Sequence, residues 1–317
     1  MRPFRFLASQ DGLADARTVI DRARRAESMG YSSLTLSDHL FEQLSPLPVL
    51  ATVAAAADRL RLGTFVLNND LRHPAVLAAD LATLDVLSGG RLEVGLGAGW
   101  NRVEYDQIGM TFDPIGRRID RLEESVGVLK GLFGPGPFTF EGRHYRITGM
   151  DGQPKPVQQP HPPLMIGGGG RRILGLAARE ADIVNFGPRQ PKDGVVDVAS
   201  YLLPALEEQL DWVREAAGPR FADLELCTYN SWTVATPVIT DHGRREAEEQ
   251  AAAVRARTGY PLTADELLDS PHAYIGSVDF LVDKIRGLRE RFGLSCFLID
   301  DTGTFAMAPV VERIAGT

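Results

Sequence analysis

The chain has 317 residues, of which 44% are apolar and 24% are charged, so it can bury a sizeable core and disorder is not indicated. The formal charge of −8, with arginine pairs scattered along the chain, argues against nucleic acid or an anionic membrane as the partner and favours a small molecule. Cys227 and Cys296 are isolated, which suggests neither a zinc site nor a disulfide framework. No signal peptide or membrane span is visible, and this predicts a cytoplasmic protein.

Helices and strands alternate from the start of the chain. "FRFLA" is the first predicted strand, and a helix from Leu13 to Met29 stops at Gly30 before the alternating strand from Ser32 to Ser37. The order of helix, turn and strand then recurs twice, in "PVLATVAAAADRL" with "RLGTFVL" and in "PAVLAADLATLDVLSGG" with "RLEVGLG".

The second half of the chain interrupts this alternation and then resumes it. After a helix from about Arg117 to Phe133, "FTFEGRHYRI" predicts a hairpin that turns at Glu141 and Gly142. Four more strands follow, in "PLMIGGGG", "ADIVNFG", "LELCTYNSWTVA" and "LSCFLID", with helices that include "RRILGLAARE" and Val278 to Phe292.

Eight alternating units favour a closed parallel barrel, the (β/α)8 or TIM barrel of the α/β class, over an open doubly wound sheet, because closure leaves no edge strand. We predict a single domain over residues 1–317. It has insertions near 134–160, 188–218 and 240–272, and the last two, mostly helical and charged, are placed to cover the C-terminal mouth of the barrel.

Unusual residues follow four of the predicted strands, at the end where barrels of this type carry their chemistry. They are Asp38 and His39, Asn68 to Asp70, Gly95 to Trp100, and Gly167 to Gly170. Taken alone, Asp38 also fits a helix N-cap, His39 a loop histidine, and the Asn68 to Asp70 run a turn. Their shared position at one mouth favours function.

Neither glycine run fits the dinucleotide fingerprint GxGxxG, because Trp100 and Arg172 stand where the third glycine belongs. The loop of Gly167, Gly168, Gly169 and Gly170 nevertheless places bare backbone N–H groups before a helix, as in phosphate sites at helix N-termini. Arg171 and Arg172 oppose the helix dipole there, which favours a bound anion, although both side chains reaching into solvent stays open. Hydrolysis by paired carboxylates that include Asp38 also stays open.

Read in order, the strand ends resemble the luciferase-like monooxygenase superfamily of (β/α)8 barrels, and most closely its coenzyme F420-dependent oxidoreductases. The resemblance spans nearly the whole chain. It rests on "SDH" at Ser37 to His39, "RLRLGTFVLNNDLRHPAVLA", "LSGGRLEVGLGAGWNRVEY", "FDPIGRRIDRLEE" and "PHPPLMIGGGGRRIL". It implies a deazaflavin or flavin across the C-terminal mouth, with the ring at strands two to four and the phosphate near the strand-five glycine loop.

The resemblance also implies roles for individual residues. Asp38 and His39 fall where family members contact the ring and the reacting substrate, and His39 is our candidate for the acid/base group, beside Asp38 as the residue to fix its tautomer. Further implied cofactor contacts are Asn68 at the ring edge, the backbone of Gly97, Ala98 and Gly99, and Arg171 beside the glycine loop. The family commonly has a non-prolyl cis peptide at the bond that matches Phe65–Val66.

Trp100 departs from the sugar-phosphate dehydrogenase branch, which has a glutamate at this position that is thought to act as an acid. A sugar phosphate is therefore not supported as the substrate. The indole either stacks on an apolar or conjugated acceptor or packs under the insertion.

We predict an oxidoreductase that transfers hydride between coenzyme F420 and an organic small-molecule substrate. The alternatives are a reduced-FMN-dependent monooxygenase that uses O2 and a non-catalytic flavin-binding protein. Since helices of this family often build dimers, a homodimer is one expected assembly. The sequence leaves open the substrate, the direction of hydride transfer and the oligomeric state.

Overall fold

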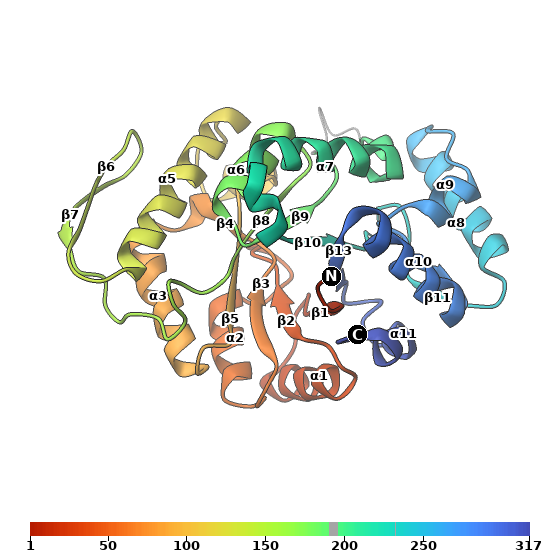
Figure 1. Ribbon diagram of the computed structural model, residues 1–317, viewed down its shortest axis with the longest axis horizontal. Coiled ribbons are helices and arrows are strands. Elements are labelled where there is room, and N and C mark those ends of the chain that lie inside the picture. Colours follow the sequence, from red (N-terminus) through yellow and green to blue (C-terminus); the bar gives the residue numbers. More distant parts are fainter. Residues whose placement is uncertain (190–195, 232) are drawn as a thin grey trace. The chain divides into compact units, whose positions relative to one another are not determined.

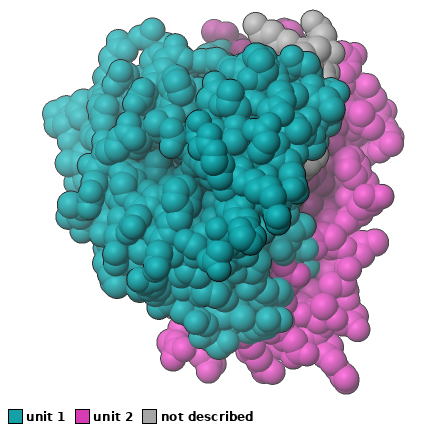
Figure 2. Space-filling view, turned by 90° about the vertical axis from the view of Figure 1, so that its right-hand side faces the viewer, with its two compact units in different colours: residues 1–10, 25–34, 167–317 teal, residues 11–24, 35–166 magenta. Residues whose placement is uncertain are grey.

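The computed structural model describes residues 1–189, 196–231 and 233–317. Residues 190–195 of the predicted insertion 188–218, and Trp232 of the run "LELCTYNSWTVA", lie outside the described residues. The chain divides into two compact units, shown in teal and magenta in Figure 2. Unit 1 comprises residues 1–10, 25–34 and 167–317, and unit 2 comprises residues 11–24 and 35–166. The single domain over residues 1–317 stays a prediction.

Eight parallel strands of the described chain form the main sheet, and the third is divided into two short pieces. In chain order they are β1 (Arg5–Ser9), β2 (Ser33–Leu36), β3 (Arg61–Thr64) with β4 (Leu67–Asn68), β5 (Leu92–Gly97), β8 (Leu164–Gly168), β9 (Ile183–Phe186), β10 (Glu225–Tyr229) and β13 (Leu294–Ile299). The strand order is β3-β2-β1-β13-β10-β9-β8-β5-β4, and β3 also pairs with β5. This order, with helices between successive strands, is that of a closed (β/α)8 barrel and confirms the predicted fold class.

Helices connect the strands (Figure 1). They are α1 (Ala16–Ser28), α2 (Pro46–Ala54), α3 (Pro74–Leu87), α4 (Arg102–Gln107), α5 (Ile115–Phe133), α6 (Arg171–Glu180), α7 (Leu203–Ala217), α8 (Gly243–Thr258), α9 (Ala264–Asp269), α10 (Val278–Phe292) and α11 (Ala308–Ile314), with 3-10 turns η1 (Asn69–Leu71), η2 (Val198–Tyr201) and η3 (Gly218–Asp223). In the described ranges, no helix is both long and apolar enough to cross a membrane. The cytoplasmic location stays a prediction.

The ends of α10 coincide with the predicted range because both are encoded locally. The Ser277 hydroxyl accepts a hydrogen bond from the backbone N–H of Phe280, which caps the first turn. Gly293 follows the last turn at φ +79°, a left-handed conformation that glycine adopts without steric cost. The sequence signals for start and stop are therefore sufficient here.

Two predicted insertions contain the expected elements. The hairpin joins β6 (Phe138–Glu141) to β7 (Arg146–Met150), and Figure 1 shows it beside α5. Glu141 is the last residue of β6 and pairs with Arg146, so the turn itself begins at Gly142. The range 240–272 contains α8 and α9, flanked by the parallel pair β11 (Val238–Ile239) and β12 (Ile275–Gly276).

The range 188–218 differs from its expected role. Most of its described part is α7, which is the regular helix between β9 and β10 rather than an addition to the barrel.

The third strand is interrupted at a cis peptide bond between Phe65 and Val66, as the resemblance implied. The neighbouring strand β5 makes room for this irregularity with two glycines. A Cβ on Gly95 would lie 2.0 Å from the Thr64 carbonyl oxygen, and one on Gly97 would lie 2.6 Å from Val66 Cγ2. These glycines are thus explained by the packing of strand three against β5.

Candidate functional site

Asp38 lies just beyond β2 and is buried, with 4% of its surface exposed. Its carboxylate accepts two hydrogen bonds from the Arg72 guanidinium, at 2.5 and 3.0 Å, and one from the backbone N–H of Asn68 at 3.0 Å. A bidentate pair of this kind fixes the carboxylate plane relative to the guanidinium plane, and it compensates the buried charge of Asp38. Asp38 therefore links the end of β2 to the end of β4. Because its carboxylate is occupied in this way, Asp38 is not free to act as the general acid of a carboxylate pair in hydrolysis.

His39, the next residue, has a different partner from the expected one. Its Nδ1 lies 2.9 Å from Oε1 of Glu104, in the first turn of α4, and the same oxygen accepts the backbone N–H of Leu40 at 3.0 Å. Glu104, rather than Asp38, therefore fixes the imidazole; the expected pairing of Asp38 with His39 is wrong. Because Oε1 is the acceptor, Nδ1 is the donor, and in the neutral ring Nε2 keeps its lone pair.

The His39–Glu104 pair is buried on one side and open on the other. The Glu104 side chain is 2% exposed, whereas 26% of the His39 side chain reaches solvent. A fixed, partly exposed imidazole whose second nitrogen has no hydrogen-bond partner among the described residues is the arrangement that proton transfer to a small molecule requires.

Asn68 ends β4, and its side chain forms the turn that the sequence alone also allowed. Its Oδ1 accepts the backbone N–H of Asp70 at 3.1 Å and the Tyr105 hydroxyl at 3.0 Å. Asp70 in turn receives a fork from Arg121 at 2.9 and 2.7 Å. Burial first, and then the Asp70 charge, raise the pKa of Tyr105 to about 12, so the phenol stays a neutral donor.

Neighbouring side chains hold the backbone from Gly97 to Gly99 in place. Gly99 has φ +73°, and a Cβ there would lie 2.2 Å from the Tyr105 hydroxyl and 2.6 Å from Asn68 Oδ1. The buried guanidinium of Arg118 donates to the carbonyl oxygens of Ala98 and Gly99. This glycine segment is therefore rigid, and its shape is set by side chains of unit 2.

Trp100 is not packed under the hairpin insertion. Half of its surface is exposed (52%), and its ring meets the His39 ring edge-on at 5.6 Å between centroids. Of the two interpretations of this indole, exposure beside His39 favours contact with a bound molecule.

The glycine loop of Gly167, Gly168, Gly169 and Gly170 belongs to unit 1 and precedes α6. Gly169 is packed tightly, since a Cβ there would lie 2.3 Å from the carbonyl group of Pro188. Gly170 is open: a Cβ there would have no described atom within 4 Å, and α6 begins without a side-chain cap from the described residues.

Arg171 has a partner within the chain, because its guanidinium lies 2.7 Å from Glu215 on the surface. Its position therefore does not by itself require a bound anion. Near the loop, buried Asn185 keeps an Oδ1 that has no partner among the described residues, and its side chain lies against Gly167.

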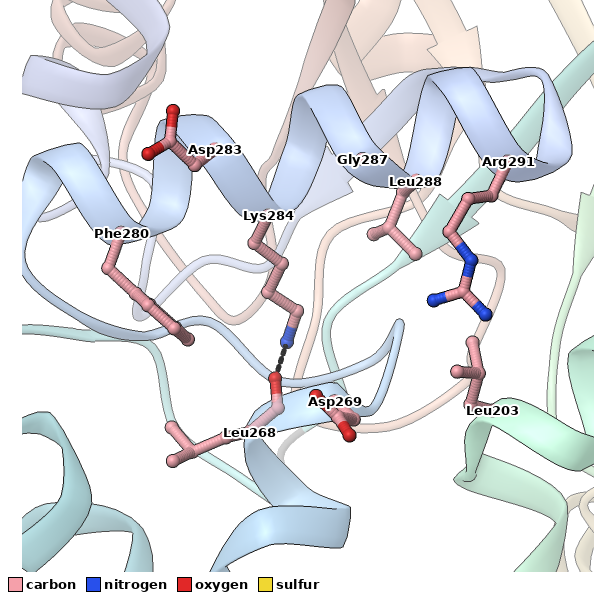
Figure 3. A pocket seen from close by; sticks show the side chains of 9 residues that line it. All are labelled: Leu203, Leu268, Asp269, Phe280, Asp283, Lys284, Gly287, Leu288 and Arg291. Carbon is pink, nitrogen blue, oxygen red and sulfur yellow. Dashed lines mark hydrogen bonds between the residues drawn. The ribbon is translucent and has the colours of Figure 1, made fainter.

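A cavity of about 230 Å³ between α7, α9 and α10 offers another candidate (Figure 3). Its cation, Lys284, points at the carbonyl oxygen of Leu268 and donates to it at 2.5 Å, and it also donates to Ser270 and Ala273 at 2.7 and 2.6 Å. All three protons of the ammonium group are thus used by backbone carbonyls. This lysine holds the end of α9 and is not available for chemistry.

A parallel barrel with polar side chains at the ends of β2, β4 and β5 has the arrangement in which barrel enzymes place their active sites. The family model described as luciferase-like monooxygenase matches residues 2–287, and the chain belongs to this family. Relatives of this chain include both a dehydrogenase and a monooxygenase.

Individual relatives match part of the chain. An F420-dependent glucose-6-phosphate dehydrogenase of Kineococcus radiotolerans is 34% identical over 216 residues, which is 65% of this chain and 61% of that protein. An FMNH2-dependent dimethylsulfone monooxygenase of Pseudomonas putida is 35% identical over 128 residues, which is 40% of this chain and 35% of that protein. The matches span less than two thirds of the length of these relatives.

Solved structures extend the likeness in fold over the full chain. The coenzyme F420-dependent tetrahydromethanopterin reductase of Methanopyrus kandleri has a TM-score of 0.77, 19% identity and 99% coverage of both chains. At this identity the likeness shows the fold. The relatives' names include both F420 and FMNH2.

Proposed function

We propose that the chain transfers hydride between coenzyme F420 and an organic small-molecule substrate, and that His39 handles the accompanying proton. The observation that carries this proposal is the 2.9 Å contact between His39 Nδ1 and buried Glu104. Because Nδ1 is held as a donor, Nε2 is the nitrogen that accepts or donates the proton at the substrate. The F420-dependent relatives support the choice of cofactor.

The start of α6 has the properties of a phosphate site. Its first N–H groups lack a side-chain cap from the described residues, and the open position of Gly170 leaves them room for an anion. We assign the cofactor's phosphate to Gly170 and the N–H groups that follow it, with Arg171 adding charge from its exposed pair with Glu215. When bound, F420 donates or accepts the hydride.

The ring of the cofactor is assigned to unit 2, at the backbone of Gly97, Ala98 and Gly99 and at Asn68. Since Oδ1 of Asn68 already accepts two hydrogen bonds, its amide nitrogen is the group left for the ring. Asp38 acts through Arg72 and the Asn68 backbone, so it positions the site rather than exchanging protons.

A reduced-FMN-dependent monooxygenase is the second candidate, because the Pseudomonas putida relative is 35% identical over its matched part and FMN also ends in a phosphate. Calorimetric titration with F420 and with FMN separates the two. We expect tighter binding of F420, and equal or tighter binding of FMN would overturn the choice of cofactor.

The role of His39 is tested in turnover. We expect His39→Ala to lower kcat by about 10²- to 10⁴-fold, the usual contribution of a positioned acid or base, with little change in cofactor affinity. The matched control is His242→Ala, an exposed histidine before α8. Full kcat in His39→Ala would contradict the role, and cofactor binding without turnover of any acceptor would favour the non-catalytic alternative.

The phosphate site is tested by neighbouring glycines. Gly170 has φ −104° and ψ 149°, so Gly170→Ala fits the backbone, whereas Gly169→Ala collides with Pro188 whether or not an anion binds. We expect Gly170→Ala to weaken F420 binding without loss of stability, and Arg171→Ala to weaken it about 2- to 5-fold. Unchanged affinity in both variants would overturn this location.

We also propose that two copies of the chain pair through α2 and α3. Asp80 is the one charged residue on the exposed surface of these fully described helices, and Val76 and Leu87 are 61% and 65% exposed. Exposed apolar faces of this kind are typical of symmetric interfaces. We expect a dimer in analytical ultracentrifugation and a monomer for Val76→Glu with Leu87→Glu, with Ile108→Glu as the control. A monomeric unmodified chain would overturn this assembly.

A further inference from the structure

Four exposed large apolar residues either have a ring contact with His39 or directly adjoin the His39–Glu104 pair in the chain. Trp100, Phe41, Leu40 and Val103 are 52%, 43%, 50% and 57% exposed. A single exposed apolar residue is ordinary, but four that adjoin one buried His–Glu pair are of the kind that marks a binding surface. We call these four residues the His39 rim.

The contacts of Glu104 and His39 fix the rim in place. Glu104 accepts the backbone N–H of Leu40 and directly follows Val103 in α4, so both residues lie beside the His39–Glu104 pair. The Phe41 ring lies 6.0 Å from the His39 ring at 23°, and the Trp100 ring lies 5.6 Å from it at 85°. The imidazole thus has one aromatic face nearly parallel to it and one perpendicular.

The charges of unit 2 argue against an anionic substrate at this rim. In its described residues, the buried and half-buried arginines of the site network are committed: Arg72 to Asp38, Arg118 to backbone carbonyls, and Arg121 to Asp70 and Asp113. Arg102 is the arginine nearest in sequence to Trp100 and Val103 of the rim, but its side chain is 73% exposed and already pairs with Asp106. An exposed arginine of this kind contributes little to holding a phosphate.

We propose that the His39 rim binds an uncharged molecule with a planar, conjugated or aromatic ring, which stacks on Trp100 and presents a carbonyl or hydroxyl oxygen to His39 Nε2. This inference rests on the proposed function for the role of His39, but the binding itself needs no cofactor. A stacked aromatic pair gains more than the burial of its area alone provides, so ring planarity is the feature that the rim selects.

Acetophenone is a suitable probe, because it joins a planar ring to a carbonyl group. Its binding is followed in the ¹⁵N-labelled full chain by the indole N–H signal of Trp100, which is assigned by its loss in Trp100→Phe. We expect a saturable shift of this signal. Ligand-observed saturation transfer then gives the affinities of variants, and we expect Trp100→Ala to bind about tenfold more weakly and Trp100→Phe to keep most of the affinity. Trp212→Phe, which also removes one indole N–H, is the control for the assignment of this signal.

Two comparison ligands sharpen the test. 1-Cyclohexylethanone has the same carbonyl and a ring of similar size that is not planar, and glucose 6-phosphate is charged and polar. We expect the first to bind several-fold more weakly than acetophenone, and the second to leave the Trp100 signal unchanged. Equal affinity for the two ketones, a Trp100 shift with glucose 6-phosphate, or no acetophenone binding would each overturn the inference.

The proposed function and this inference fail in distinguishable ways. Acetophenone binding at Trp100 with full kcat in His39→Ala would contradict the proton role and leave the ring site intact. Loss of kcat in His39→Ala without acetophenone binding would do the opposite.

Discussion

Glu104 Oε1 lies 2.9 Å from His39 Nδ1 and 3.0 Å from the backbone nitrogen of Leu40, so one buried oxygen orients both the imidazole and the chain that carries it. This relationship joins residues 65 positions apart, at the end of β2 and in the first turn of α4. The orientation of His39 therefore depends on the folding of unit 2, which brings Glu104 next to it.

Glu104 is therefore expected to be a positioning residue. We predict that Glu104→Ala lowers kcat roughly 10- to 100-fold, a part of the about 10²- to 10⁴-fold that a positioned acid or base supplies. Glu104→Gln, which keeps an acceptor oxygen, should recover most of this loss. The ¹⁵N shifts of His39 report whether Nδ1 carries the proton, and we expect this signature to be lost in Glu104→Ala. Unchanged shifts in that variant would contradict the assignment.

The Asp38–Arg72 pair leads to a prediction about stability. Removing Arg72 leaves a carboxylate that is 2% exposed without its cation, and breaking a buried pair in this way costs about 3–5 kcal/mol. Since 23% of the Arg72 side chain is exposed, we expect Arg72→Met to lose about 2–3 kcal/mol in urea denaturation. The double variant with Asp38→Asn should regain part of it, and a loss below about 1 kcal/mol would show that the pair is dispensable.

Much of this unit follows from short sequence signals. The alternation before Asp38 and the turn glycine after "DVLS" predict strand and helix ends, and strand ends place Asp38, His39 and Asn68 at one edge of a parallel sheet. These signals are local, because side-chain alternation and capping depend on neighbours within a few residues.

The partners of the site residues were not predictable in the same way. Glu104 lies in "NRVEY", where an acidic residue in the first turn of a helix is common because it complements the helix dipole. Nothing in the neighbouring sequence connects Glu104 with His39. Only the structure shows that Glu104 and the following Tyr105 are both almost fully buried in a helix of six residues. Arg171 shows the reverse case: its partner Glu215 lies on another helix, so its place in the first turn of α6 does not by itself indicate an anion.

His272 provides a pH-dependent prediction in unit 1. It is buried, its Nδ1 lies 2.7 Å from the Tyr229 carbonyl oxygen, and the rings of Tyr201 and Tyr229 flank it. Burial is the largest cause that lowers the pKa of His272 from 6.5 to about 4. The hydrogen bond to Tyr229 opposes this shift, and the Lys284 charge adds to it. Between these values the unfolded chain binds a proton that the folded chain does not, so stability falls as the pH drops.

We expect this histidine to contribute up to about 3 kcal/mol to the loss of stability between pH 6.5 and 4. The measurement is urea denaturation across this range for the unmodified chain and for His272→Gln. The variant should show a flatter dependence on pH, whatever its absolute stability, because the titrating group is gone. Parallel pH profiles for the two proteins would contradict the prediction.

Lys284 gives the last prediction. Its stem is partly exposed along the cavity of Figure 3, while its ammonium group donates to the carbonyl oxygens of Leu268, Ser270 and Ala273 at 2.5 to 2.7 Å. These carbonyls belong to the end of α9 and the turn after it, where intrahelical donors have run out. One side chain therefore takes the place of three missing backbone donors.

Lys284→Met keeps the apolar stem and removes the donors, so the three carbonyls lose their shared partner. We expect a loss of about 2–4 kcal/mol in urea denaturation, since each buried acceptor left unsatisfied costs about 1–3 kcal/mol and some of these groups will recruit water. Hydrogen exchange should accelerate first in the amides of α9. Asp283→Ala, an exposed neighbour on the same helix, is the control and should change stability by less than about 0.5 kcal/mol. If Lys284→Met is as stable as the unmodified chain, these carbonyls are satisfied by water and the lysine does not hold α9.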